Sequence, residues 1–452
     1  MTRLAPVSRR ELIQRLHRLL FTMLRDAYLP ASLAHSREPV FRAVDHPGIR
    51  YHAARWTPDA LGRVVAALHE GTEALREIPD DDLLAAWGDT VATFLRTGSL
   101  ERRALDPPLA RLCGLSRDGL RAGLEAVLGG ARREPAAALL ARARPAPADA
   151  GPVLAILASN LPGLAVQPLL PALLARRPVL LKSPSAEPLF APAFLTALAR
   201  REPRLAGALA AATWPGGDRK LEAPVLAGVG TVLAYGDRAA LDDLEGRAPG
   251  RVVGYGPRAS LGIVGAAADP RKAAEGLARD VALFDQRGCL SVVAVYTAGD
   301  ARELAERLAS ELSDIAQRWP PGPRERSLSA AVQHLRLEAE MHGLWQSALP
   351  LQEGTVIVDP DPELRPSPGL RTVRVHPLQD LSRLPDLLAP WRGRLQGAAL
   401  AGEEAWALEP RLAELGVSRC APPGELQSPD ATWHNGGIDP LEALTSPSPR
   451  DR

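Results

Sequence analysis

The sequence predicts an α/β protein in which a helical N-terminal region precedes two α/β domains. Three observations lead to this fold class. The chain has 452 residues, more than one compact core accommodates. Apolar residues recur three and four positions apart from about residue 9 to residue 145, as in amphipathic helices. Beyond residue 150, short apolar runs alternate with longer helical segments, which is typical of βαβ units around a parallel sheet.

The N-terminal region, residues 1–148, is predicted to be helical and to pack on the domain that follows. Its periodic segments are RRELIQRLHRLLFTMLRDAY, PDALGRVVAALHEGTEALREI, DDLLAAWGDTVATFLR and SRDGLRAGLEAVLGGA. The first segment is basic and amphipathic, so it either packs on the rest of the protein or docks on a membrane surface or a partner. It lacks the continuous apolar core of a signal peptide. The Pro- and Ala-rich stretch RARPAPADAGP at 142–152 loses the helical period and marks the boundary.

The first α/β domain, residues 149–258, is predicted to bind a nucleotide. Strands are expected at 152–159, 178–183, 229–236 and 251–256, and helices at 164–177 and 187–212. Ligands of a parallel sheet lie beyond the carboxyl ends of its strands, so a nucleotide is expected there. The sequence completes neither GxGxxG nor GxxxxGK[ST], which excludes the standard dinucleotide fingerprint and the P-loop.

The second α/β domain, residues 259–442, is predicted to be catalytic. The sequence predicts strands at 259–265, 290–297, 354–359 and 370–377, separated by helices at about 270–283, 300–317 and 327–345. The last ten residues, 443–452, contain TSPSPRDR and are expected to form a disordered tail.

Composition excludes several classes of function. Lys and Arg total 54 against 53 Asp and Glu, so no overall field favours nucleic acid. Cys113, Cys289 and Cys420 are far apart and odd in number, which argues against disulfides and a zinc site and favours the cytoplasm. His334 and His342 are too far apart on one helix for a paired metal site, and we expect no metal. No apolar run reaches the roughly 18 residues of a transmembrane segment.

Three turns beyond predicted strands carry candidate ligand groups. Asn160 follows the first strand in ASNLPG, where its amide is either an oxyanion donor or an ordinary N-cap. Lys182 follows the second strand, where it either meets a ribose or phosphate or is a solvated lysine. Gly216 and Gly217 form a turn in WPGGD, which permits close approach of the backbone to a ligand or is merely a turn.

Cys289 is the candidate nucleophile. Gln286, Arg287 and Gly288 precede it. An adjacent cation lowers a thiol pKa from its usual value near 8.5, and a glycine lets substrate approach. Free cysteines are also commonly buried and inert, so these residues alone leave both interpretations open. The other two cysteines lack such flanks and are taken as structural.

Taken together and in this order, these residues resemble the aldehyde dehydrogenase superfamily. The resemblance is closest to its acyl-CoA reductase branch, which includes the reductase subunit of the fatty acid reductase complex of luminous bacteria. It covers about residues 150 to 440. The stretches that carry it are ILASNLPGLAVQPLLPALL, VLLKSPSAEPLFA, TWPGGD, VLAYGD, VVGYGPRASLGIVG, LARDVALFDQRGCLS and WHNGG, the last with His434 as a residue without an assigned role.

The resemblance implies a role for each candidate residue. Cys289 is implied to be the acylated nucleophile, and Asn160 and the Cys289 backbone N–H the oxyanion donors. Lys182 is implied to bind the adenosine ribose. The other residues implied to lie at the cofactor are Ser185, which follows Lys182, Gly216 and Gly217, where the backbone passes it, and Tyr235 and Gly236, where a helix begins near the pyrophosphate.

Two departures from the superfamily refine the expected reaction. Hydrolytic members carry Glu-Leu-Gly-Gly, whose Glu activates water, but the corresponding stretch 253–257 reads VGYGP and has no carboxylate. This favours reduction of an acyl-cysteine over its hydrolysis. NAD-preferring members often place a Glu near the position of Ser185, and its absence lets Lys182 pair with a 2′-phosphate. NADPH is therefore expected as the cofactor, in preference to NADH.

The expected function is the NADPH-dependent reduction of a fatty acyl thioester to an aldehyde through an acyl-cysteine. The donor is either an acyl-CoA or an acyl-protein. An acyl-protein synthetase partner and self-association into a homo-oligomer are also expected from the resemblance. Two alternatives share the fold: an NAD(P)-dependent aldehyde dehydrogenase, and a non-catalytic scaffold that binds an acyl synthetase. If the protein reduces acyl thioesters, Arg287 is expected to favour the thiolate or to bind CoA phosphates, and Arg279 and Asp280 are expected only to cap or pair.

Overall fold

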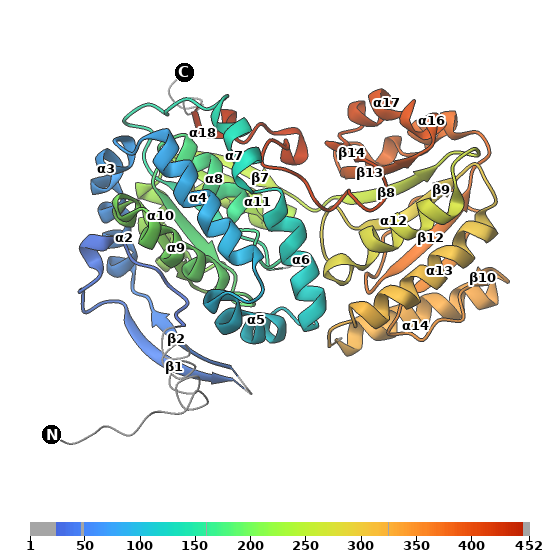
Figure 1. The fold of residues 1–452 in the computed structure, drawn as a ribbon, viewed down its shortest axis with the longest axis horizontal. Helices are drawn as coiled ribbons and strands as arrows, with labels where there is room; N and C mark the ends of the chain where they lie inside the picture. Colours follow the sequence, from blue (N-terminus) through green and yellow to red (C-terminus); the bar gives the residue numbers. More distant parts are fainter. Residues whose placement is uncertain (1–23, 47–48, 160, 324, 446–452) are drawn as a thin grey trace.

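The computed structural model describes residues 24–46, 49–159, 161–323 and 325–445, which form two lobes (Figure 1). A five-stranded parallel sheet forms the centre of the first lobe, and a seven-stranded sheet forms the centre of the second. A separate two-stranded hairpin projects from the first lobe. The α/β fold class is confirmed. Within the described residues, no helix combines the length and apolar character needed to span a membrane.

The sheet of the first lobe has the strand order β5-β4-β3-β6-β7. Its strands are β3 (Val153–Ile156), β4 (Val179–Ser183), β5 (Leu209–Thr213), β6 (Thr231–Tyr235) and β7 (Arg251–Tyr255). Its connecting helices are α8 (Val166–Leu174), α9 (Phe190–Arg201), α10 (Arg219–Gly228) and α11 (Arg238–Arg247), with the 3₁₀ turn η2 (Pro203–Gly207) before β5. The four strands predicted here, and the helix at 164–177, are confirmed.

Residues alternate between the two faces of this sheet, as the two-residue period of strands requires. On β6, Leu233 packs with α8 and α9, whereas Val232 and Ala234 pack with α10 and α11. Both faces are covered, which is why the strands read as continuous apolar runs.

The prediction of one helix over 187–212 is wrong at its end. Residues 209–213 form β5, which pairs with β4 and, on its outer side, with Tyr28 through two backbone hydrogen bonds of 2.9 Å. The segment reads LAAAT, and alanine intrinsically favours a helix. Its first four residues are nevertheless completely buried, so packing within the sheet overrides the local preference.

Among the described residues of the N-terminal region, the α-helices begin at residue 58, after a short 3₁₀ turn at Ala31–Leu33. Its helices are α2 (Pro58–Glu70), α3 (Thr72–Arg76), α4 (Asp80–Leu95), α5 (Leu100–Leu112), α6 (Arg117–Gly129) and α7 (Arg133–Leu140). The prediction of helix before residue 58 is wrong in two places. The strands β1 (Val40–His46) and β2 (Ile49–Arg55) pair in antiparallel fashion, and Arg25 and Tyr28 form isolated bridges. The earlier part of that predicted helix, 9–23, lies outside the described residues.

The seven-stranded sheet of the second lobe has the order β10-β11-β12-β9-β8-β13-β14. Its strands are β8 (Ala259–Val264), β9 (Val292–Thr297), β10 (Trp345–Gln346), β11 (Thr355–Val358), β12 (Thr372–Pro377), β13 (Leu395–Ala401) and β14 (Arg419–Ala421). Its helices are α12 (Pro270–Ala282), α13 (Ala301–Arg318), α14 (Arg326–Met341), α15 (Leu384–Leu387), α16 (Glu403–Trp406) and α17 (Glu409–Glu414). The predicted strands and helices are present, while β10, β13 and β14 were not predicted.

The end of the chain returns to the first lobe and forms α18 (Glu442–Thr445) there (Figure 1). Ala443 and Leu444 are buried in the core of that lobe. Arg177 donates a hydrogen bond of 3.0 Å to the carbonyl of Leu444. The predicted tail therefore does not begin at residue 443, because burial fixes residues 443–445. Residues 446–452 lie outside the described part of the chain.

Candidate active site

Cys289 lines a cavity of about 260 Å³ between the two lobes. The first lobe contributes the loop after β3, the starts of α8 and α11, and the ends of β6 and β7. The second lobe contributes the Cys289 loop and Gln396. The helix α6 contributes Val127, and the returning C-terminal segment supplies the rest. The lining residues used below are Tyr235, Gly236, Asp237, Tyr255, Arg258, Phe284, Gln396, Gln427 and Asn435.

The loop before Cys289 has an unusual backbone. Phe284, Asp285 and Gln286, in the short 3₁₀ turn η3 (Leu283–Gln286), have φ angles of 55°, 52° and 65°. This left-handed region costs a non-glycine residue about 1–2 kcal/mol. The loop therefore depends on contacts with its surroundings to stay in this conformation.

Those contacts come from side chains of the loop itself. Asp285 forms a buried ion pair of 2.8 Å with Arg371 and accepts a hydrogen bond of 2.9 Å from the Gly322 N–H. Gln286 donates to the carbonyls of Val292 and Thr372, and its own carbonyl oxygen accepts from the Thr372 N–H at 2.7 Å. The turn before the nucleophile is thus fixed to β9 and β12.

Arg287 contacts the helical region. Its guanidinium donates to the carbonyls of Cys113 and Gly114, at the end of α5. The cation whose charge lowers the Cys289 pKa is Arg258, which lies just before β8. Arg287 thus joins the Cys289 loop to the first lobe, and its expected effect on the thiolate or on CoA phosphates stays a prediction.

The Cys289 thiol is partly accessible but strongly desolvated. Burial raises its pKa to about 11, although the backbone N–H groups of Cys289 and Leu290 and the charge of Arg258 act in the opposite direction. Arg258 is oriented by hydrogen bonds to the carbonyls of Leu395 at 3.2 Å and Gly436 at 3.5 Å. The thiol is thus neutral at neutral pH, with a fixed cation nearby to stabilise its ionised form.

A buried network supports the other side of the nucleophile. The Ser260 hydroxyl donates to the Cys289 carbonyl at 2.8 Å. Ser291 donates to the side-chain oxygen of Gln427, and the amide nitrogen of Gln427 donates to the Asp280 carbonyl. The Asp280 carboxylate accepts from the Gly424 N–H at 2.7 Å, and burial raises its pKa to about 7. Asp280 thus fixes the loop that brings Gln427 to the cavity.

Tyr235 and Tyr255 form the wall contributed by the first sheet. They are register partners at the ends of β6 and β7, and their rings stack with centroids 4.6 Å apart. Tyr235 forms a side-chain hydrogen bond with Asn435, whose oxygen accepts from the Gln396 amide at 2.7 Å. Tyr235 was predicted near the cofactor pyrophosphate, yet its side chain lies in the Cys289 cavity.

Lys182 lies on the opposite face of the first sheet. It is buried, and its Nζ is 5.3 Å from the centroid of the Trp214 ring. Burial lowers its pKa, and the charge of Glu222 raises it. Glu222 also pairs with Arg247 at 2.7 Å. A carboxylate therefore lies near Lys182, although the residues that follow Lys182 in sequence contain none until Glu187.

The remaining predicted cofactor residues occupy the same edge of the sheet. Ser185 is exposed, and nothing lies within 4 Å of where a Cβ on Gly216 or Gly217 would stand. Gly217 has φ of 77°, a conformation that favours glycine. Gly236 lines the Cys289 cavity at the start of α11. Asn160 lies outside the described residues, so its place at the site stays a prediction.

These observations also test whether a nicotinamide nucleotide fits. Beside Lys182, the Nε1 of Trp214 is buried and has no hydrogen-bond partner within the described residues. A cation and an orphaned donor at the carboxyl end of β4 match the oxygen-rich ribose and phosphate groups of a nucleotide. The residues present therefore fit such a cofactor.

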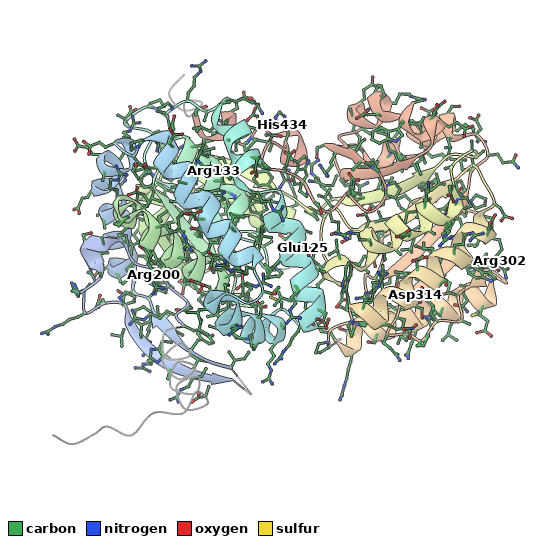
Figure 2. All side chains as sticks on the ribbon, viewed as in Figure 1. Glu125, Arg133, Arg200, Arg302, Asp314 and His434 are labelled. Carbon is green, nitrogen blue, oxygen red and sulfur yellow. The ribbon has the colours of Figure 1, made fainter. Side chains whose placement is uncertain are left out.

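Sequence reasoning missed most residues of the cavity, among them Arg258, Gln396, Gln427 and Asn435. Asn435 lies in WHNGG and Arg258 in GYGPRAS, two stretches that carried the resemblance, but neither was assigned a function. His434, the residue before Asn435, is exposed on the returning segment, and its Nε2 lies 3.4 Å from Oδ2 of Asp439 (Figure 2). Gln396 and Gln427 give no local signal, because β13 and the loop after β14 bring them to the site.

The fold and the site together define an aldehyde dehydrogenase-like protein in which a cysteine lines a cavity between two α/β lobes. Two solved structures illustrate the shared fold. Aldehyde dehydrogenase 21 from Physcomitrella patens is 14% identical with a TM-score of 0.73, over 94% of this chain and 96% of that one. The Δ-pyrroline-5-carboxylate dehydrogenase from Mycobacterium tuberculosis is 15% identical with a TM-score of 0.68, over 97% and 92%.

The chain belongs to the acyl-CoA reductase (LuxC) family, whose model matches residues 116–446. Curated relatives include the long-chain acyl-protein thioester reductases of Vibrio harveyi and Aliivibrio fischeri. Each is 26% identical, over 50% and 51% of this chain respectively and 49% of the relative. The enzyme of Photobacterium leiognathi is 24% identical over 64% of this chain and 62% of its own length. The matches thus span about half to two thirds of the relatives.

Proposed function

We propose that this protein reduces a long-chain acyl thioester to an aldehyde through an acyl-Cys289 intermediate, with NADPH as the hydride donor. The proposal rests on the cavity, whose described lining residues include Cys289 and Arg258 but no glutamate that could act as a base. Asp237 is the acidic residue among the described lining residues, and its carboxylate accepts from the Ala240 N–H as the N-cap of α11. Such a cavity favours thioester exchange and disfavours hydrolysis.

In the first half-reaction, Cys289 Sγ forms a bond to the acyl carbon while the bond to the donor thiol breaks. Arg258 stabilises the attacking thiolate, and backbone N–H groups beside the thiol are placed to donate to the oxyanion. In the second half-reaction, NADPH held beside Lys182 and Trp214 would supply a hydride to the acyl carbon. The carbon–Sγ bond then breaks, the aldehyde leaves, and Cys289 returns as a thiolate.

The relatives' names favour an acyl-protein donor, and the family description favours acyl-CoA. We propose that both are thioester substrates of the same cysteine. A synthetase partner, a homo-oligomer and the preference for NADPH over NADH remain parts of this proposal. Lys182 supports a 2′-phosphate, whereas the nearby Glu222 disfavours one unless Arg247 neutralises it.

The test is intact-mass analysis with peptide mapping after incubation with dodecanoyl-CoA, or with a dodecanoylated carrier protein, without cofactor. The expected result is an acyl adduct on Cys289 that disappears on addition of NADPH as dodecanal appears. Cys289→Ala should form no adduct. NADH in place of NADPH should discharge the adduct more slowly. Dodecanoic acid in place of dodecanal would favour a hydrolytic dehydrogenase, and absence of any adduct from both donors would favour the scaffold alternative.

A further inference from the structure

The side chain of Tyr235 lies on the same side of the first sheet as the reacting cysteine. Leu233, two residues earlier on β6, packs on the face covered by α8, whereas Lys182 and Trp214 lie on the other face. Since side chains alternate along a strand, Tyr235 faces away from the predicted nucleotide side. Its ring stacks on Tyr255, and both rings line the cavity of Cys289.

The hydrogen bonds around Tyr235 have a definite direction. The Gln396 amide nitrogen donates to the Asn435 oxygen at 2.7 Å. The contact with Asn435 lowers the pKa of the Tyr235 phenol, as a hydrogen-bond donor does, so Asn435 presents its N–H group to Tyr235. The Tyr235 oxygen is the acceptor in this bond, and its own proton is left for another group. No second partner of the Tyr235 hydroxyl is found within the described residues.

The phenol also keeps its proton. Burial chiefly, and then Tyr255 and Cys289, raise the pKa of Tyr235 well above its ordinary value. A neutral phenol that already accepts one hydrogen bond is a stronger donor of the next, because chained hydrogen bonds polarise one another. The group thus has a free O–H in a cavity whose other wall contains the nucleophile.

We propose that the Tyr235 hydroxyl, oriented by Gln396 and Asn435, donates a hydrogen bond to the thioester oxygen as that oxygen becomes an oxyanion on Cys289. The inference rests on the proposed function, since it requires an acyl group at this cysteine. It assigns Tyr235 to the reacting carbonyl and removes its side chain from the cofactor. No proton is transferred in this step: the hydroxyl only stabilises the negative charge that forms and disappears on the acyl oxygen.

The test compares two reactions of the same thiol in the full chain. Acylation by dodecanoyl-CoA develops an oxyanion, whereas alkylation by iodoacetamide does not. Tyr235→Phe should slow acylation at saturating thioester by roughly a hundredfold, the typical cost of losing one oxyanion donor, and leave alkylation unchanged. Tyr51→Phe, which removes the same hydroxyl on β2 away from the cavity, should change neither rate.

Three other outcomes would overturn the proposal, each in a distinguishable way. Wild-type acylation rates in Tyr235→Phe would show that the hydroxyl does not meet the oxyanion. Equal slowing of acylation and alkylation would show that the ring only positions the thiol. Failure of the wild-type chain to acylate at all, while Cys289 still alkylates, would overturn the proposed function itself and this inference with it.

Discussion

At the residue scale, the reactivity of Cys289 is set by the balance between burial and the charge of Arg258. Burial raises the thiol pKa to about 11, and Arg258 opposes that rise. Because only the thiolate is nucleophilic, raising the pH increases the reactive fraction until the pKa is reached. The structure therefore predicts a thiol whose reactive fraction is small at neutral pH and grows as the pH rises.

We expect the rate of Cys289 alkylation by iodoacetamide to rise about tenfold per pH unit between about pH 7 and pH 10. Arg258→Gln should lower the rate at each pH, since loss of the cation raises the thiol pKa further. Peptide mapping of Cys289 measures both effects. Arg271→Gln, an exposed change at the start of α12, is the control. A rate independent of pH, or faster alkylation in Arg258→Gln, would contradict this account.

The roles of some residues at the site could be predicted from the sequence, and the roles of others could not. Cys289 could be selected because Gln286, Arg287 and Gly288 flank it. The sequence could not show that Arg258 lowers the Cys289 pKa or that Arg287 contacts the end of α5, because residues close in sequence need not be close in the fold. The left-handed turn before Cys289 directs Arg287 toward α5. Arg258, 31 positions earlier, reaches the thiol only because β8 and the catalytic loop adjoin.

At the scale of elements, the seven-stranded sheet is linked to the catalytic loop by the ion pair of Asp285 and Arg371. Both side chains are almost completely buried. Arg371→Met should lower the free energy of unfolding by about 3–5 kcal/mol, because it leaves the Asp285 charge buried without its partner. Arg365→Met should cost at most about 1 kcal/mol, because its pairs with Asp361 and Glu363 are exposed and the buried Asp359 keeps its closer partner Arg374. Urea unfolding measures both, and equal effects would show that the Asp285 pair does not maintain the loop.

Elements were predicted well where local pattern and packing agree. The predicted strands β3, β4, β6 to β9, β11 and β12 are apolar runs bounded by turns, and all are present. β5 and β13 escaped prediction because LAAAT and LQGAALA favour a helix locally, while their position inside a sheet determines their structure. The hairpin at 40–55 was missed because its strands carry charges on their exposed positions and lack long apolar runs.

At the scale of the whole molecule, the catalytic loop belongs structurally to both lobes. Phe284 lies two residues after α12, yet its ring is buried in the core of the first lobe. It packs directly on α6, where Gly123 leaves room for it, and a Cβ on Gly123 would overlap the ring. The two lobes are therefore joined at the residues that shape the Cys289 cavity, so a change in their packing must also alter the site.

We expect Gly123→Ala to lower the stability of the protein, although alanine favours a helix more than glycine does. Alanine in a helix is favoured over glycine by about 1 kcal/mol, but the overlap with Phe284 should cost about 1–3 kcal/mol and displace a ring that lines the cavity. Gly129→Ala, on the same helix with nothing within 4 Å of the new Cβ, should retain the gain alone. Thermal unfolding and the rate of Cys289 acylation, measured on both variants, separate the two effects. If Gly123→Ala proved as stable and as readily acylated as Gly129→Ala, the contact between Gly123 and Phe284 would not be needed for stability. The shape of the cavity would then not depend on close packing of the two lobes at this point.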